Sequence, residues 1–211
     1  MRIVVCDVGL GNLRSVERAL IEAARGRSDE VEIARDAARI QHADKLVMPG
    51  QGGFGDCARA LSEGFASSIL AHLATGRPYL GICLGLQILF GSSEEAPGCA
   101  GLGVFEGHVA RLPGGRDLTT GAPLKIPHVG WNVAEPTRMA ERMQLLTATE
   151  YFYFVHSFAV VPREGRIIAA TTDYGPSFVS AVAQDNIFAC QFHPEKSQHA
   201  GLALLERFLA S

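Results

Sequence analysis

In the first half of the chain, short apolar runs alternate with segments in which apolar residues recur every three or four positions. Four runs, at residues 2–6, 31–34, 45–48 and 79–83, predict buried strands. Helical spacing follows in the segments 13–21, 58–73 and 84–90, and Gly64 is expected to divide the second of these. Strands separated by helices predict a mostly parallel sheet with helices on both faces.

The second half is richer in strands. Seven further strands are predicted, at 108–112, 131–134, 151–156, 158–161, 167–172, 178–184 and 187–191, with an irregular zone at 113–127. Few helices intervene before a closing helix at 199–209, so these strands are expected to pair antiparallel. We therefore expect one α/β domain over residues 1–211, whose mostly parallel central sheet is flanked by helices and carries an antiparallel extension.

Composition narrows the class of protein. The 211 residues are 47% hydrophobic and 19% charged, which is typical of a globular chain with a sizeable core. The net charge of −3 gives no reason to expect a nucleic-acid or membrane partner. Five scattered cysteines without a signal peptide favour the reducing cytoplasm. We expect no metal and no cofactor, because no motif for either is present.

Cys83 stands on a predicted strand-to-helix turn within Gly81-Ile82-Cys83-Leu84-Gly85. A nucleophile on such a turn is held in a strained conformation, and glycines two residues away on either side remove Cβ atoms that would clash. The following helix N-terminus favours an anion and hence the thiolate. The competing interpretation of this short pattern is an inert core cysteine. The other four cysteines lack this setting.

His193 is the histidine best placed to act as a base for that nucleophile. It follows a strand in Gln191-Phe192-His193-Pro194-Glu195, and Pro194 disfavours the helical conformation at His193. In an extended chain residues i and i+2 point to the same side, so Glu195 is expected to hold the imidazole. A solvent-exposed turn is the alternative. Together with Cys83, the pattern favours a Cys-His-Glu triad.

A glycine-rich loop, Pro49-Gly50-Gln51-Gly52-Gly53-Phe54, follows the third predicted strand. Backbone N–H groups of such a loop can hold the oxyanion of acyl-transfer chemistry. A phosphate loop is the rival interpretation, but the Lys-Ser/Thr that such a loop requires is missing. A plain turn remains the third possibility.

These motifs resemble class I glutamine amidotransferases, the glutaminases with a Cys-His-Glu triad. Within that family, four stretches resemble the glutaminase subunits of imidazole glycerol phosphate synthases. They are residues 7–16 (DVGLGNLRSV), 127–132 (PHVGWN), 153–158 (YFVHSF) and the Lys-Ser after Glu195. The resemblance spans nearly the whole chain.

The resemblance implies a function for particular residues. Cys83 would attack the carboxamide of L-glutamine, His193 would transfer protons and Glu195 would orient His193. The Leu84 N–H and the loop Gly50, Gln51 and Gly52 would form the oxyanion hole. Gln87 and the backbone of His156, Ser157 and Phe158 would contact the bound glutamine. Gln51 departs from the family pattern, which has a small or branched apolar residue there, and this puts the switching of the loop in question.

The resemblance also implies a partner, a (β/α)₈-barrel cyclase subunit that receives the ammonia in histidine biosynthesis. The complex is expected to be a heterodimer, with Asn12, Trp131 and Lys196 at the interface. Core packing of Trp131 and a solvated turn at Lys196 are the simpler alternatives. Two rival functions are the glutaminase of a pyridoxal phosphate synthase and a catalytically dead regulatory subunit.

Overall fold

The computed structural model describes residues 1–116 and 120–211, so part of the irregular zone predicted at 113–127 lies outside the described residues. The first half of the chain forms a parallel sheet. Four strands form this sheet in the order β2-β1-β3-β4. They are β1 (Arg2–Cys6), β2 (Glu30–Ala34), β3 (Lys45–Gly50) and β4 (Tyr79–Cys83). The burial of β1, β3 and β4 on both faces explains why each is a nearly continuous apolar run.

The antiparallel extension begins next to β4. Strand β11 (Ile187–Cys190) pairs parallel with β4 and antiparallel with β10 (Ser177–Gln184). The order then continues through β9 (Ile168–Asp173), β6 (His128–Pro136) and β7 (Glu150–His156), while β8 (Phe158–Pro162) joins β10 to β5 (Gly107–Arg111). The predicted fold class, an α/β sheet with an antiparallel extension, is confirmed.

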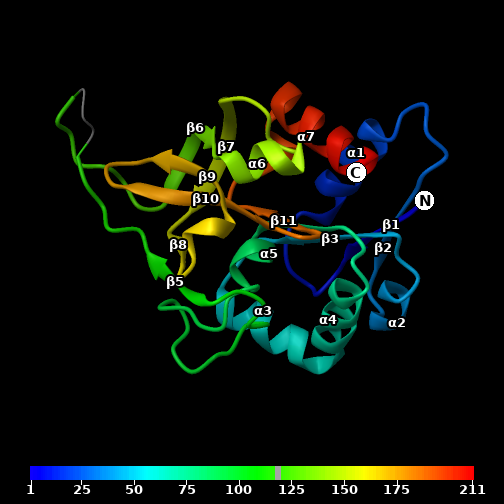
Figure 1. Cartoon of the computed structure of the whole chain (residues 1–211). Coiled ribbons are helices and arrows are strands. Elements are labelled where there is room, and N and C mark those ends of the chain that lie inside the picture. The colour runs from blue at the N-terminus through cyan, green and yellow to red at the C-terminus, as the bar shows by residue number, and fades with distance from the viewer. Residues whose placement is uncertain (117–119) are drawn as a thin grey trace.

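Helices cover both faces of the sheet (Figure 1). One face packs against α1 (Leu13–Ala23), α6 (Arg138–Met143) and α7 (Gln198–Ala210). The other packs against α2 (Ala37–Ile40), α3 (Phe54–Ala60), α4 (Ala66–Ala74) and α5 (Leu84–Gln87). Two hydrophobic cores therefore hold the sheet between two helical layers.

Gly64 divides the predicted 58–73 helix, as expected. It lies at φ +138° in a π-helical turn (Leu61–Phe65) between α3 and α4. The predicted start at residue 58 is wrong, because α3 already begins at Phe54. The Phe54 N–H, which has no partner within the helix, donates to the Glu95 carboxylate from a loop 41 residues away. No local sequence pattern predicts such a cap.

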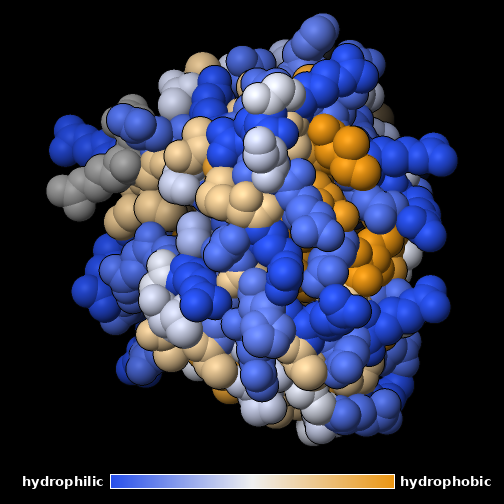
Figure 2. Space-filling model, turned by 90° about the vertical axis from the view of Figure 1, so that its right-hand side faces the viewer, coloured by the Kyte–Doolittle hydropathy of each residue, from blue (hydrophilic) through white to orange (hydrophobic). Residues whose placement is uncertain are grey.

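Two short helices, α2 and α6, were not predicted, and 3₁₀ turns occur at Gly165–Ile167 and Pro194–Lys196. Within the described residues, no helix combines the length and apolar character needed to cross a membrane. The side seen in Figure 2, which lies to the right in Figure 1 near edge strand β2, is hydrophilic over most of its area and carries a smaller hydrophobic patch. Its polar character suits an edge strand that has no further strand to pair with.

Candidate active site

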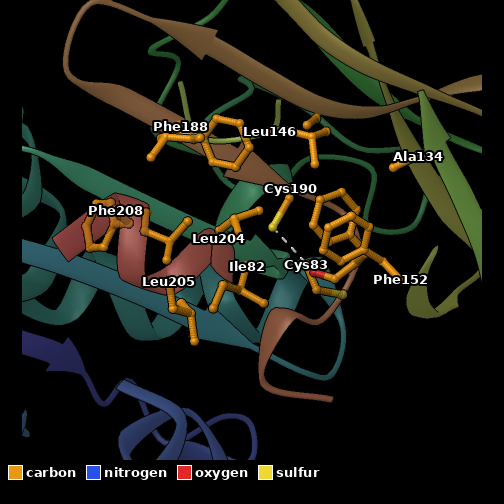
Figure 3. Close-up of a cluster of buried hydrophobic side chains, with 14 of the residues drawn as sticks. Ile82, Cys83, Ala134, Leu146, Phe152, Phe188, Cys190, Leu204, Leu205 and Phe208 are labelled. Atoms are coloured by element: carbon orange, nitrogen blue, oxygen red, sulfur yellow. Dashed lines mark hydrogen bonds between the residues drawn. The ribbon is translucent and has the colours of Figure 1, made fainter. Parts of the chain in front are cut away.

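Cys83 occupies a strained turn between β4 and α5. Its backbone lies at φ +55° and ψ −103°, although it is not a glycine. Such a conformation costs of order 1–3 kcal/mol and persists where the surroundings enforce it, typically at functional sites. Figure 3 shows Cys83 at the rim of the core cluster that contains Ile82 and Phe152. The geometry is that of a nucleophile elbow, as the sequence predicted.

Close backbone packing enforces this turn. A Cβ on Gly85 would lie 1.9 Å from the Met48 carbonyl oxygen, and one on Gly81 would lie 2.5 Å from the Gly85 carbonyl oxygen. A Cβ on Gly50 would lie 2.7 Å from the Leu84 Cβ. These distances are too short for real Cβ atoms, so glycine is required at all three positions. The elbow and the end of β3 are thereby pressed together, which brings the glycine-rich loop to Cys83.

His193 approaches the Cys83 turn from the end of the neighbouring strand, β11. Because β11 pairs with β4, with Cys190 opposite Ile82, the residues that follow each strand emerge side by side. His193 is extended, at φ −106° and ψ 93°, and its Nδ1 lies 2.8 Å from Glu195 Oε1. The predicted contact between these two side chains is confirmed, whereas the alternative of a solvent-exposed turn is wrong, because both are buried.

The electrostatics of His193 favour its charged form. Burial by itself lowers the pKa of His193, but the adjacent Cys83 thiol and Glu195 carboxylate outweigh it and raise that pKa well above its ordinary value. The buried Nε2, opposite the nitrogen that meets Glu195, makes no regular hydrogen bond. His193 is therefore positioned to take a proton from Cys83 while Glu195 fixes its ring.

Three of the remaining four cysteines are in inert settings. Burial raises the pKa of Cys6 and of Cys190, and it raises that of Cys57 to about 12, so these thiols stay protonated. Cys57 lies on helix α3. Cys99 is partly exposed, and all five cysteines are free. Only Cys83 has both an elbow and a buried histidine beside it among the described residues.

A cleft of about 380 Å³ opens at Cys83, and we call it the active-site cleft. It brings together most of the predicted oxyanion and substrate residues. Its lining contains Gln51, Gly52, Cys83, Leu84, Gln87, Glu95, Pro127, Tyr153, Val155, His156, Ser157, Phe158 and Lys196. Gly50 lies directly behind it, at the end of β3 and against Leu84. A larger cavity of about 490 Å³ lies elsewhere, between Tyr79 and Phe208, and contains none of the triad.

Glu95, Tyr153 and Gln191 are among the residues of this region that the sequence analysis did not predict. Glu95 lines the cleft and caps α3 directly after the glycine-rich loop, Tyr153 forms part of its wall, and Gln191 donates from Nε2 to Cys83 Sγ at 3.4 Å. Gln191 stands in the quoted histidine motif, and its alternation with His193 along an extended chain is the signal that points to it. Glu95 has no comparable signal.

The three predicted interface residues lie on the surface around the cleft. Trp131 is 47% exposed and packs edge-to-face on Tyr153, while the Lys196 ammonium lies 5.6 Å from the centre of the same ring. Core packing of Trp131 is thereby excluded. Asn12 is exposed and caps α1 through Ser15. Its neighbour Gly11 packs against the backbone at Gly50 and Gln51, so the Asn12 loop borders the glycine-rich loop.

The family model of the class-I glutamine amidotransferases matches residues 4–211. The chain belongs to this glutamine amidotransferase family. Among its relatives, the imidazole glycerol phosphate synthase subunit HisH of Syntrophotalea carbinolica is 47% identical over 98% of both chains. The HisH subunit of Aquifex aeolicus is 46% identical over 99% of this chain and 96% of that relative.

Solved structures agree with this class I amidotransferase fold. The structure of PurLQS from Thermotoga maritima aligns with 99% of this chain and 97% of its own, with a TM-score of 0.73 at 17% sequence identity. At that identity the likeness concerns the fold alone. The elbow, the buried histidine and the cleft therefore lie in an established amidotransferase scaffold.

Proposed function

We propose that this chain is the glutaminase subunit of an imidazole glycerol phosphate synthase. It hydrolyses L-glutamine to glutamate and ammonia, and it delivers the ammonia to a cyclase subunit in histidine biosynthesis. The observation that carries the proposal is the buried Cys83–His193–Glu195 arrangement at the cleft of a chain whose HisH relatives are 46–47% identical over almost its whole length.

The triad performs acyl transfer in two steps. His193 takes the proton of the Cys83 thiol, and the resulting sulfur anion attacks the carboxamide carbon. His193 then passes that proton to the departing nitrogen, so that the C–N bond breaks and ammonia leaves. Water then attacks the glutamyl thioester, with His193 accepting one of its protons and returning it to sulfur as glutamate departs. Glu195 holds the ring and stabilises the imidazolium.

The oxyanion is held by backbone donors. The first N–H groups of a helix have no partner within it, and Leu84 begins α5 directly after the nucleophile. Gly52, at φ +128°, gives the loop Gly50–Gly52 a backbone conformation that side chains disfavour. We assign the second oxyanion donor to this loop, where Gln51 lines the cleft.

The cleft matches the two ends of glutamine. The Phe158 carbonyl is occupied by Gln87 and His156, and the Ser157 carbonyl accepts from Leu112 N. The carbonyls of Ser157 and Phe158 are therefore already paired, which leaves backbone N–H groups of this segment to meet the α-carboxylate. The Glu95 carboxylate suits the α-ammonium.

The partner of this chain is assigned to the surface that surrounds the cleft mouth. Trp131 supplies an exposed aromatic anchor, and Lys196 and Asn12 supply polar contacts. The partner is a (β/α)₈-barrel cyclase that makes imidazole glycerol phosphate and aminoimidazole carboxamide ribonucleotide. The complex is a heterodimer in the cytoplasm, where the five free cysteines remain reduced.

The deciding experiment measures glutamate release by the wild type and by Cys83→Ser, each with and without the cyclase. We expect activity only with intact Cys83, and a higher rate with the cyclase bound to its ligand. Cys99→Ser, which changes a partly exposed cysteine away from the cleft, is the matched control. Equal rates for wild type and Cys83→Ser would refute the proposal. Activation by a ring-forming synthase instead of the cyclase would point to the pyridoxal phosphate pathway.

A further inference from the structure

A hydrogen-bond chain links strand β6 to the nucleophile through two buried histidines. Asn132 Nδ2 lies 3.3 Å from His128 Nε2, and His128 Nδ1 lies 3.2 Å from His156 Nε2. His156 Nδ1 lies 2.9 Å from the Phe158 carbonyl oxygen. We call the pair His128 and His156 the histidine relay.

The chain continues from the Phe158 carbonyl to Cys83. Gln87 Nε2 donates to that carbonyl at 3.1 Å and to Gln191 Oε1 at 3.1 Å. Gln191 Nε2 in turn donates to Cys83 Sγ at 3.4 Å. The Phe158 carbonyl therefore accepts from both sides, which uses both of its lone pairs.

The contacts at both ends fix the protonation of each ring. A carbonyl only accepts, so His156 Nδ1 carries hydrogen and its Nε2 accepts from His128 Nδ1–H; His128 Nε2 then accepts from Asn132. Both rings are neutral. In keeping with this, burial lowers the pKa of His128 to about 4, and burial is the largest cause that lowers the pKa of His156 to about 3.

The same contacts fix the amide of Gln87. Both of its N–H bonds are used, so only Oε1 remains for a ligand in the cleft, and within the described residues no donor reaches it. Gln87 therefore presents an acceptor, which fits an N–H of the substrate. A flipped amide would present donors and repel one.

We propose that His128 and His156 are positioning residues for glutamine hydrolysis: by holding the Phe158 carbonyl, they lock Gln87 with its acceptor in the cleft and Gln191 on the Cys83 sulfur. This rests on the proposed glutaminase function and deepens it. Stacking holds the His128 ring in place. Its centre lies 4.9 Å from the ring centre of Phe154 and 4.0 Å from that of Tyr174.

The test compares His128→Asn with His128→Leu in the complex with the cyclase. Asn and Leu have nearly the same shape, but only Asn keeps a donor at the position of Nδ1. We expect His128→Asn to stay within about threefold of the wild-type KM for glutamine, and His128→Leu to raise KM at least tenfold. A purely structural role would reduce the folded fraction and hence kcat in both variants, with KM unchanged. That result would overturn the relay.

A second measurement is independent of activity. The ¹⁵N NMR spectrum of the full chain reports which ring nitrogens carry hydrogen. We expect neutral His128 and His156 at pH 7, each protonated on Nδ1. An Nε2-protonated or charged His156 would overturn the relay. If the wild type hydrolyses no glutamine with the cyclase, the proposed function fails, and this spectrum still decides whether the relay is arranged as described.

Discussion

His193 Nδ1 lies 2.8 Å from a carboxylate oxygen of Glu195, and both side chains are almost completely buried, at 1% and 2% exposure. Removed from water, this contact determines both the ring orientation and the charge of the base. Glu195 Oε2 is buried and has no hydrogen-bond partner among the residues that the structure describes, so the carboxylate interacts with the imidazole alone there.

Glu195→Gln is expected to lower kcat by about 10²- to 10⁴-fold, because the amide neither fixes the tautomer reliably nor stabilises imidazolium. The pKa of His193, which Glu195 helps to raise, should fall in this variant. Steady-state glutamate release, measured with the cyclase across pH, tests both effects. Glu206→Gln, which changes an exposed residue of α7, serves as the control. A Glu195→Gln enzyme as fast as that control would contradict the role assigned to Glu195.

Gly85→Ala is expected to destabilise the fold by at least about 3 kcal/mol, since its Cβ would strike the Met48 carbonyl, which is backbone and not free to rotate away. Gly165→Ala, where no atom lies within 4 Å of the added carbon, should change stability by less than about 1 kcal/mol. Urea unfolding of both variants provides the measurement. Similar midpoints would show that the elbow tolerates a side chain.

Glu95→Gln is expected to raise KM for glutamine at least tenfold, because a charged contact with the α-ammonium is lost. Its oxygen can still accept from Phe54 N, so the α3 cap should survive. Glu94→Gln is the matched control, because the neighbouring carboxylate accepts from Arg111 N outside the cleft. A Glu95→Gln enzyme with wild-type KM would remove Glu95 from the ammonium site.

Trp131→Ala is expected to weaken cyclase binding by about 2 kcal/mol, or about 30-fold in Kd, with little effect on the stability of the free chain. Val161→Ala removes a side chain of similar exposure, 45% against 47%, from β8. Isothermal titration calorimetry with the cyclase compares them. Unchanged affinity in Trp131→Ala would place the partner on another surface.

Stability should fall with acidification because of the histidine relay. The pKa of His128 in the folded chain is about 4, below the ordinary value of 6.5. Between these two pH values the unfolded chain therefore binds a proton at His128 that the folded chain does not bind. This contribution is complete above pH 6.5 and declines as pH falls toward 4, by about 2 kcal/mol at pH 5. His156 acts in the same direction.

His128→Asn should therefore lose about 2 kcal/mol less stability between pH 7 and pH 5 than the wild type does. Chemical denaturation at several pH values measures the difference. His199→Asn, on the exposed start of α7, should keep the wild-type pH dependence. If both variants behave alike, His128 is not held neutral in the folded chain.

The sequence predicted what is encoded locally. Short apolar runs revealed β1 and β4, because strands buried on both faces must be apolar throughout. Cys83 and His193 were found because their motifs contain their own geometry, glycines around one and a Pro-Glu after the other. The short helices α2 and α6 lack enough turns for periodicity to appear.

What the sequence did not reveal depends on contacts between distant segments. The Glu95 cap and the Gln87–Gln191 contact join residues 41 and 104 positions apart. Polar side chains at such positions look the same in the sequence whether they end in solvent or in a network.

The strands that carry Cys83 and lead to His193 are hydrogen-bonded neighbours. The spacing of nucleophile and base is thus a property of the sheet and cannot be opened by hinge motion without rupturing the molecule. Control of turnover must instead act on mobile oxyanion donors or on access to the cleft. The roughly one hundred residues between the two strands leave this fixed pair and return to it, so the parts of that segment outside the cleft can change for new partners while the chemistry stays in place.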